Sequence, residues 1–215
     1  MPPLRCVLGG AAAVSLGLLA AVPAGAQGLG AFAQGGYFSM TAADSAQAVF
    51  DSSGGPTFGG GLSYGFGRHF YVEGAFRHFS KEGERVFVAS PTSPVFKLGF
   101  PLKMRIRTIY GTVGYRYPLG KSGFVPYVGV GGGSASYREE STIAGETETE
   151  TRSKASFHGL IGLEYGRGHV RLAAEGIYTT VSDAIGVGGV SKVYGEDDLG
   201  GFVAQAKLVF SLKKR

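Results

Sequence analysis

The sequence is poor in cysteine, tryptophan and charge. Its 215 residues include one cysteine, Cys6, and no tryptophan, and 17% of them are charged, against about 25% in a typical soluble domain. A single cysteine excludes a disulfide within the chain. After residue 27 no run of about 18 apolar residues occurs, which excludes a transmembrane helix in that part. The formal net charge of +5 is modest and the basic residues are dispersed, so nucleic acid is not an expected partner.

The first 26 residues have the composition of a secretory signal peptide. Arg5 precedes an uncharged apolar run, Val7–Ala21, and a small-residue cleavage site follows at Ala24-Gly25-Ala26. A membrane helix is the alternative, but the run is shorter than the span of about 20 residues that a bilayer requires. We therefore expect a signal peptide at residues 1–26, and one exported domain at residues 27–215.

Glycine and aromatic residues are abundant, with 38 glycines, 15 phenylalanines and 11 tyrosines. Glycine at this frequency disfavours helices, whereas aromatic residues favour strands. Apolar and polar residues also alternate with the period of two that is typical of strands. The pattern predicts eight strands, at residues 28–39, 57–67, 69–79, 104–117, 124–137, 154–166, 169–181 and 199–211.

The connections between the predicted strands alternate in length. Short turns are expected at 67–68, 118–123 and 166–168, and long loops at 40–56, 80–103, 138–153 and 182–198. Short turns on one side and long loops on the other are typical of outer-membrane barrels, and each strand is long enough to cross a bilayer at a tilt. We therefore predict an all-β fold, an eight-stranded antiparallel up-and-down transmembrane β-barrel in the bacterial outer membrane, with both termini on the periplasmic side.

One face of the predicted strands is apolar and the other carries charge. The charged face contains Glu73, Arg77, Arg116, Glu164, Arg171, Glu175 and Lys207. An Arg or Lys that faces lipid at mid-depth costs about 2–4 kcal/mol, so in a membrane barrel this face must point inward. Arg105 and Arg107 have the opposite parity and should lie beyond the membrane. A soluble barrel with an apolar interior would alternate similarly, but the connections, the aromatic residues near the short turns and the missing Gly-x-Trp motif of lipocalins count against it.

Two neighbouring segments resemble a known family. Residues 114–120 (GYRYPLG) and 126–131 (PYVGVG) are similar to the fourth and fifth strands of small outer-membrane barrels, namely the OmpA-like, OmpX-like and opacity-protein-like β-barrel domains. The resemblance implies the same barrel, contact with outer-membrane lipids and lipopolysaccharide, and insertion by the outer-membrane assembly machinery. Members usually end on an aromatic residue, whereas here Phe210 is followed by Ser211 to Arg215. The resemblance implies a fold and no particular activity.

The inward charges have mixed sign and can pair with one another. Side chains just fill the interior of an eight-stranded barrel, and buried charges require partners. The turn at 166–168 should place Tyr165 opposite Val170 and Glu164 opposite Arg171, with the last two pointing inward. We expect paired charges to plug the lumen, and a narrow gated pore is the alternative.

The element His78-Phe79-Ser80 suggests a catalytic alternative. His78 and Ser80 have lipid-facing parity and Glu82 follows, so a serine activated by histidine could attack an ester of lipid A. The element loosely resembles the His-x-Ser element of outer-membrane lipid A deacylases, but Lys81 stands where that family has asparagine. Such a pair more often marks a membrane–water boundary, so we expect no enzyme and no catalytic residues. With no P-loop, dinucleotide motif, Cys-x-x-Cys or His-Glu-x-x-His, we also expect no cofactor and no metal.

The segment 80–103 is the main candidate for a binding surface. Two apolar stretches flank its Ser/Pro-rich centre, which predicts a hairpin that continues the third and fourth strands above the membrane. The candidate contact residues are Arg85, Phe87, Phe96, Lys97, Lys103, Arg105 and Arg107. The basic residues would meet lipopolysaccharide phosphates, or acidic groups on a host surface or partner protein, whereas the apolar ones could equally pack on each other. The acidic loop 138–153 is the second candidate.

A structural or adhesion-like role is the main hypothesis for the whole protein, with a lipid A-modifying enzyme and a small porin as alternatives.

Overall fold

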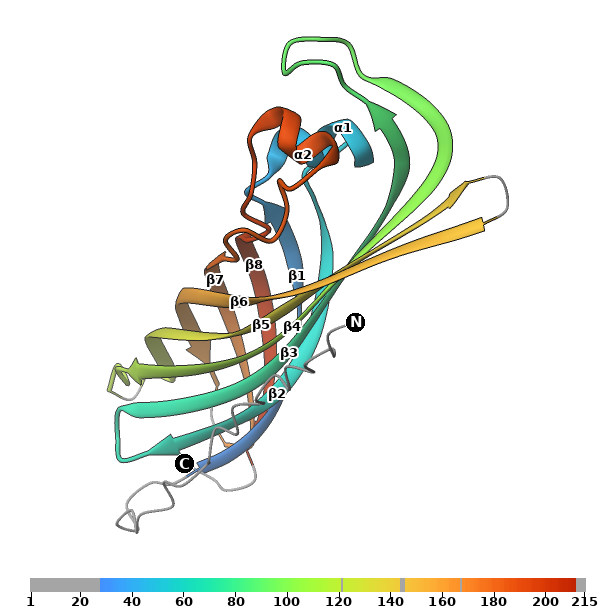
Figure 1. Ribbon diagram of the computed structural model, residues 1–215. Coiled ribbons are helices and arrows are strands. Elements are labelled where there is room, and N and C mark those ends of the chain that lie inside the picture. Colours follow the sequence, from blue (N-terminus) through green and yellow to red (C-terminus); the bar gives the residue numbers. More distant parts are fainter. Residues whose placement is uncertain (1–27, 121, 144–145, 167, 212–215) are drawn as a thin grey trace, which may run out of the picture.

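Eight antiparallel strands form a closed barrel in the computed structural model of the protein (Figure 1). The structure describes residues 28–211 apart from 121, 144–145 and 167, so the expected signal peptide lies outside the described residues. Each strand pairs with the next along the chain, and β8 closes the ring against β1. The strands are β1 (Gly28–Met40), β2 (Gly54–Phe66), β3 (Phe70–Phe87), β4 (Phe96–Arg116), β5 (Phe124–Ile143), β6 (Glu146–Tyr165), β7 (Val170–Thr180) and β8 (Gly201–Ser211). The predicted up-and-down barrel is confirmed.

The four central strands extend beyond the rest of the barrel. β3 to β6 have 18 to 21 residues, whereas β1, β2, β7 and β8 have 11 to 13. The β3–β4 hairpin predicted above the membrane is present, and its last paired residues are Phe87 and Phe96. In Figure 1 this hairpin (green) rises above the barrel, while the β5–β6 hairpin (yellow to orange) projects to one side.

The acidic segment 138–153 is part of a β-hairpin, so the expectation of a loop there was wrong. β5 continues to Ile143 and β6 begins at Glu146. The hydroxyl oxygens of Thr142 and Thr147 lie 3.3 Å apart across the two strands. Threonine is β-branched and suits a strand, but a segment of threonine and glutamate has no apolar alternation for the period-two test to detect.

Two short helices lie beside the mouth of the barrel, at its long-loop end (Figure 1). α1 (Ala43–Phe50) and α2 (Gly189–Tyr194) occupy segments that were predicted as loops. The Glu196 carboxylate accepts hydrogen bonds from the backbone N–H groups of Asp44 and Ser45, at 3.1 and 2.9 Å. The Glu196 carboxylate thus accepts hydrogen bonds from backbone N–H groups in the first turn of α1 that have no partner within the helix, and so it fixes α1 to the segment after α2. No helix in the described part of the chain is long and apolar enough to cross a membrane.

Large apolar side chains cover the outside of the barrel. Ile109, Val113 and Ile161 are each more than half exposed, although strands pair on both sides of them. Aromatic rings gather near the short turns, where Phe124 and Tyr165 lie 4.6 Å apart between ring centroids. An apolar band bordered by aromatic rings is the outer surface that a lipid bilayer requires.

The register between β6 and β7 differs by two residues from the predicted one. Glu164 lies opposite Ala173 rather than Arg171, and Tyr165 lies opposite Leu172 rather than Val170. The turn is wider than predicted because the first residues of β7 pair with β8 alone, and the Ser211 N–H donates to the His169 carbonyl at 2.8 Å. A shift of two residues keeps each side chain on its face, so Glu164 and Arg171 still point inward.

Candidate functional site

All seven charges of the predicted inward face lie in the barrel interior, where each is more than nine-tenths buried. They are Glu73, Arg77, Arg116, Glu164, Arg171, Glu175 and Lys207. The strands position them because alternate residues of each strand face the lumen. We call these seven residues the lumen charges.

Most lumen charges belong to one connected set of ion pairs. The Lys207 ammonium lies 2.7 Å from a carboxylate oxygen of Glu73 and 2.6 Å from one of Glu175. The Arg116 guanidinium lies 3.7 Å from Glu73 and 3.5 Å from Glu164. Five strands, β3, β4 and β6 to β8, are therefore linked across the lumen. Removing one partner would leave a buried charge uncompensated.

The two other cations have different partners. Arg171 pairs with Glu164 and also donates to the Ser211 hydroxyl at 2.6 Å. Arg77 has no carboxylate partner among the described residues. It donates to the Tyr110 hydroxyl at 3.2 Å, and its guanidinium lies 5.0 Å from the centre of that ring. The lumen charges thus comprise three carboxylates and four cations. Arg77 is the cation without a carboxylate among the described residues, and the Tyr110 ring stabilises it instead.

Neutral polar side chains that were not among the predicted site residues complete this network. Tyr127 donates to Glu175 at 2.7 Å. Gln205 donates to the side-chain oxygen of Gln34 at 3.0 Å, and Gln34 donates to Tyr110 at the same distance. These residues share the inward parity of the charges, so strand alternation was the signal that could have found them.

Glycines at inward positions make room for tyrosine rings. A Cβ atom added at Gly162 would lie 2.3 Å from the ring of Tyr127, and one at Gly114 would lie 2.3 Å from the ring of Tyr71. The two rings meet edge to face at 5.9 Å, and the Arg116 guanidinium lies 4.5 Å from the centre of Tyr71. Each ring therefore lies over the glycine that faces it in the register of the neighbouring strand, where no side chain is in the way.

An apolar layer follows the charged layer on the side of the long loops. Its buried residues include Phe38, Met40, Phe79, Met104, Ile106, Ile177, Val181, Leu199 and Val203. The rings of Phe38 and Phe79 meet edge to face at 5.1 Å, and α1 adds Ala46 to the same cluster. The interior therefore has two layers, a charged one nearer the short turns and an apolar one nearer the mouth.

The structure brings the predicted basic residues of the β3–β4 hairpin next to acidic ones. The ion pairs are Arg85–Glu148 at 3.0 Å, Lys97–Asp51 at 2.8 Å, Lys103–Glu82 at 2.6 Å and Arg105–Glu140 at 3.0 Å. Exposed pairs of this kind stabilise little, but they neutralise much of the positive surface predicted for the hairpin. Arg107 has no carboxylate partner in the described part of the chain and lies opposite His78.

The apolar residues at the end of the hairpin remain exposed. Phe87 lies opposite Phe96, yet each ring is 57% exposed, and Leu98 is 47% exposed. They lie about ten residues of strand beyond Arg107, or roughly 30 Å along β4. The apolar outer band of the barrel does not reach this far, so contact with lipid does not account for their exposure.

His78 and Ser80 do not form a catalytic arrangement. The Ser80 hydroxyl donates to the Met104 carbonyl at 3.3 Å, and the His78 ring packs 5.1 Å from that of Phe58. Glu82 is ion-paired with a lysine of β4. No carboxylate among the described residues therefore orients the histidine toward the serine, as a serine nucleophile would need.

A family model described as "Outer membrane protein beta-barrel domain" matches residues 11–197. This chain belongs to that family. Among solved structures, a major outer membrane protein from Thermus thermophilus aligns with a TM-score of 0.59 and 10% identity, over 87% of this chain and 100% of that one. Neisserial surface protein A aligns with a TM-score of 0.50 and 13% identity, over 86% and 96%. No curated protein matches the sequence.

Membership of the outer-membrane barrel family places this chain in the bacterial outer membrane, with the apolar outer face of its strands toward lipid. The family and its structural neighbours are mostly barrels that are not enzymes. Identities of 10% and 13% show the fold alone. The particular role of this outer-membrane barrel must therefore be argued from its own residues.

Proposed function

We propose that this outer-membrane barrel is a non-conducting scaffold that presents the β3–β4 hairpin for contact with other surfaces. The observation that carries the proposal is the exposed aromatic pair, Phe87 and Phe96, at the end of the hairpin. The residues between them carry no charge. Exposed apolar patches remote from lipid tend to mark contact sites, so this hairpin end suits an apolar partner surface.

The packing of the interior supports a scaffold rather than a pore. An ion crossing the barrel would have to pass the paired lumen charges and then the apolar layer that contains Phe38 and Phe79. Transfer of an ion into such a layer is costly without a partner of opposite charge. We therefore assign the lumen a structural role and the projecting hairpins the interaction.

Lipopolysaccharide is the proposed partner nearest to the membrane. Arg105 lies opposite Arg138 in the strand register, and both pair with one carboxylate, that of Glu140, at 3.0 and 2.9 Å. With Arg107 on the same face and without a carboxylate partner among the described residues, this part of the outer surface carries three guanidinium groups and one paired carboxylate. This excess of positive charge lies directly beyond the apolar band, where lipopolysaccharide phosphates would meet it.

A double substitution tests the hairpin contact. Cells that produce the Phe87→Ser/Phe96→Ser variant should attach severalfold less to polystyrene and to cultured epithelial cells than cells with the unchanged protein. The matched control is Leu119→Ser, which removes an exposed apolar side chain at a short turn on the opposite side of the barrel and should leave attachment unchanged. Both variants should keep the heat-dependent gel mobility of a folded barrel. Unchanged attachment by the phenylalanine variant would exclude the hairpin end and make the acidic β5–β6 hairpin the next candidate.

A further inference from the structure

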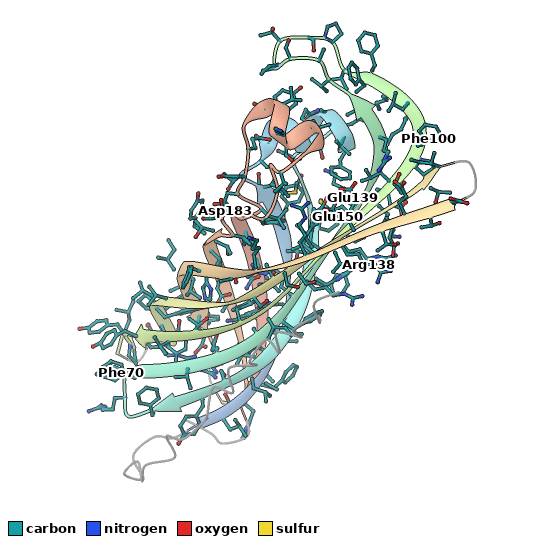
Figure 2. All side chains as sticks on the ribbon, viewed as in Figure 1. Phe70, Phe100, Arg138, Glu139, Glu150 and Asp183 are labelled. Carbon is teal, nitrogen blue, oxygen red and sulfur yellow. The ribbon has the colours of Figure 1, made fainter. Side chains whose placement is uncertain are left out.

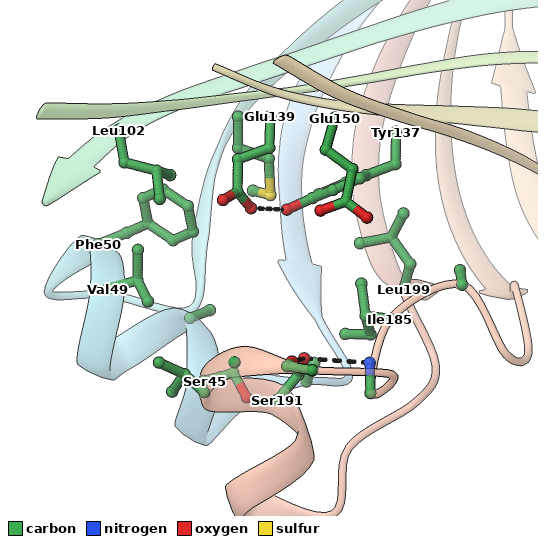
Figure 3. Close-up of a pocket in the computed structure, with 18 of the residues that line it drawn as sticks. Ser45, Val49, Phe50, Leu102, Tyr137, Glu139, Glu150, Ile185, Ser191 and Leu199 are labelled. Carbon is green, nitrogen blue, oxygen red and sulfur yellow. Dashed lines mark hydrogen bonds between the residues drawn. The ribbon is translucent and has the colours of Figure 1, made fainter. Parts of the chain in front are cut away.

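A pocket of about 450 Å³ lies at the mouth of the barrel, between the two helices and the extended strands (Figure 3). Its walls are mostly apolar. Phe50 comes from α1, Leu102 and Met104 from β4, and Ile185 and Leu199 from the chain on either side of α2. A concave, largely apolar space of this volume is within the range of pockets that bind small molecules.

Two carboxylates, those of Glu139 and Glu150, line the strand side of this mouth pocket. They lie directly opposite each other in the β5–β6 register, an arrangement that is unfavourable unless a positive charge compensates it. Arg152 compensates Glu150 by donating from Nε at 2.7 Å. Among the described residues, Glu139 accepts a hydrogen bond only from the Tyr137 hydroxyl.

The other groups around Glu139 do not neutralise it. Burial and the neighbouring Glu139 carboxylate raise the pKa of the Tyr137 phenol, which therefore stays neutral. Arg85 also lines the pocket, but it is ion-paired with Glu148 at 3.0 Å. Each arginine of the lining has a carboxylate, so the charge left without a partner in the described structure is negative.

A second polar group of the pocket also has no partner. The Ser45 side chain on α1 is more than nine-tenths buried, and its hydroxyl makes no hydrogen bond within the described structure. Leaving a buried hydroxyl unsatisfied is unfavourable, so the group points to a molecule that the pocket receives. In Figure 3, Ser45 and Glu139 lie on opposite sides of the apolar space.

We propose that the mouth pocket binds a small amphipathic amine, with its protonated nitrogen at Glu139 and its apolar body against Phe50 and Leu102. A further hydrogen-bonding group of the ligand would reach Ser45. An unpaired carboxylate selects a cation over an anion, and the apolar walls select a molecule with a hydrophobic body over a simple ion. This site is separate from the hairpin end, so either proposal can fail without the other.

Monodansylcadaverine, a fluorescent primary amine, provides the test. The barrel in phosphatidylcholine nanodiscs should bind it saturably, with brighter emission than empty nanodiscs. Glu139→Gln should weaken binding at least about tenfold, because a hydrogen bond to a charged group contributes on that scale. The matched control Glu146→Gln removes a carboxylate at the end of the same hairpin, outside the pocket, and should bind like the unchanged protein.

Two further measurements distinguish binding in the pocket from partition into the lipid, and test whether the ligand must be a cation. Leu102→Trp fills the pocket and should abolish binding, while its heat-dependent gel mobility shows that it still folds. Dansylglycine carries the same fluorophore on a carboxylate and should bind weakly. Equal amine binding by the Leu102→Trp or Glu139→Gln variant, or no saturable binding at all, would overturn the site. Tighter binding of dansylglycine would overturn the assignment of a cationic ligand.

Discussion

Glu164 holds two buried arginines at once. Its carboxylate pairs with Arg171 and lies 3.5 Å from Arg116. Without it, the only carboxylate left near Arg116 would be the more distant Glu73, at 3.7 Å, and Arg171 would keep the Ser211 hydroxyl but no carboxylate among the described residues. In a low-dielectric interior a charge that loses its partner is costly, so single residues of this network control stability.

Replacing Glu164→Ala should therefore lower the free energy of unfolding by about 3 kcal/mol, the lower end of the range for breaking a buried pair. The measurement is urea unfolding in lipid vesicles, followed by the loss of the heat-modifiable band. Glu82→Ala removes one partner of an exposed pair and should leave the unfolding midpoint nearly unchanged. Equal midpoints for the two variants would show that the lumen pairs do not stabilise the barrel.

A glycine contact in the lumen can be tested in the same way. Gly162→Leu places a side chain where the Tyr127 ring already lies, 2.3 Å from the new Cβ, and should destabilise the barrel by about 1–3 kcal/mol or prevent folding. The matched control is Gly159→Leu. A Cβ at Gly159 would meet nothing within 4 Å, and the new side chain would point toward lipid. The yield of heat-modifiable protein after refolding should fall for Gly162→Leu alone. Similar yields for both would contradict a filled lumen.

Among the structural elements, β4 combines a lipid-facing part with a part above the membrane. Its outward residues change from Ile109 to Arg107 and Arg105 within one step of the strand alternation. Arg105 is held by Glu140, whereas Arg107 faces outward without a carboxylate partner in the described chain. The boundary of the apolar band is therefore also the point where β4 offers a positive charge to its surroundings.

Arg107→Ala should weaken binding of the purified barrel to vesicles that contain lipopolysaccharide more than Arg105→Ala does. The difference should appear at low ionic strength and vanish in about 1 M salt, where the screening length falls to about 3 Å. Vesicles of phosphatidylcholine alone serve as the control. A larger effect of Arg105→Ala, or an effect that salt does not change, would contradict a phosphate contact at Arg107.

In the whole molecule, a barrel with a side-chain-filled interior carries long extensions at one end only. The charged layer lies nearer the short turns, the apolar layer lies nearer the mouth, and α1 packs onto the second through Ala46. Figure 2 shows side chains filling the space between the strands as well as covering the outside. The extended strands and the two helices all project at the same end, which is where the proposed contacts lie.

The unchanged protein should show at most small and rare openings in planar bilayers. The physical reason is that both layers would have to part before water could form a continuous path. Large, stable openings would overturn the scaffold proposal in favour of a porin. Phe79→Ser/Ile106→Ser places hydroxyls in the apolar layer and should increase the frequency of openings. That increase would show that the apolar layer limits conduction.

The alternation along the strands allowed the fold and the inward charges to be predicted, since a strand with one face in lipid cannot place an arginine or lysine there cheaply. The alternation did not predict the ends of β5 and β6. Above the membrane both faces of a strand meet water, so the Thr/Glu-rich residues after Arg138 had no apolar face to reveal them. The helices were not predicted for a different reason. α1 has only eight residues, too few for a clear helical period, and it is held in place by Glu196, which is distant in the sequence.

By itself, the sequence determined the number of strands, the parity of each residue and hence which side chains enter the lumen, because these depend only on local alternation. The predicted pairing of Glu164 with Arg171 is present although the register differs by two residues. Only the tertiary structure decided which other lumen charges meet, as the ion pair between Glu73 of β3 and Lys207 of β8 shows. It also decided that the basic hairpin residues are ion-paired and that Glu139 and Ser45 line one pocket. The physical reason is that pairing across a closed barrel depends on strand register and on contacts between distant segments, and neither is recorded in the order of residues along one strand.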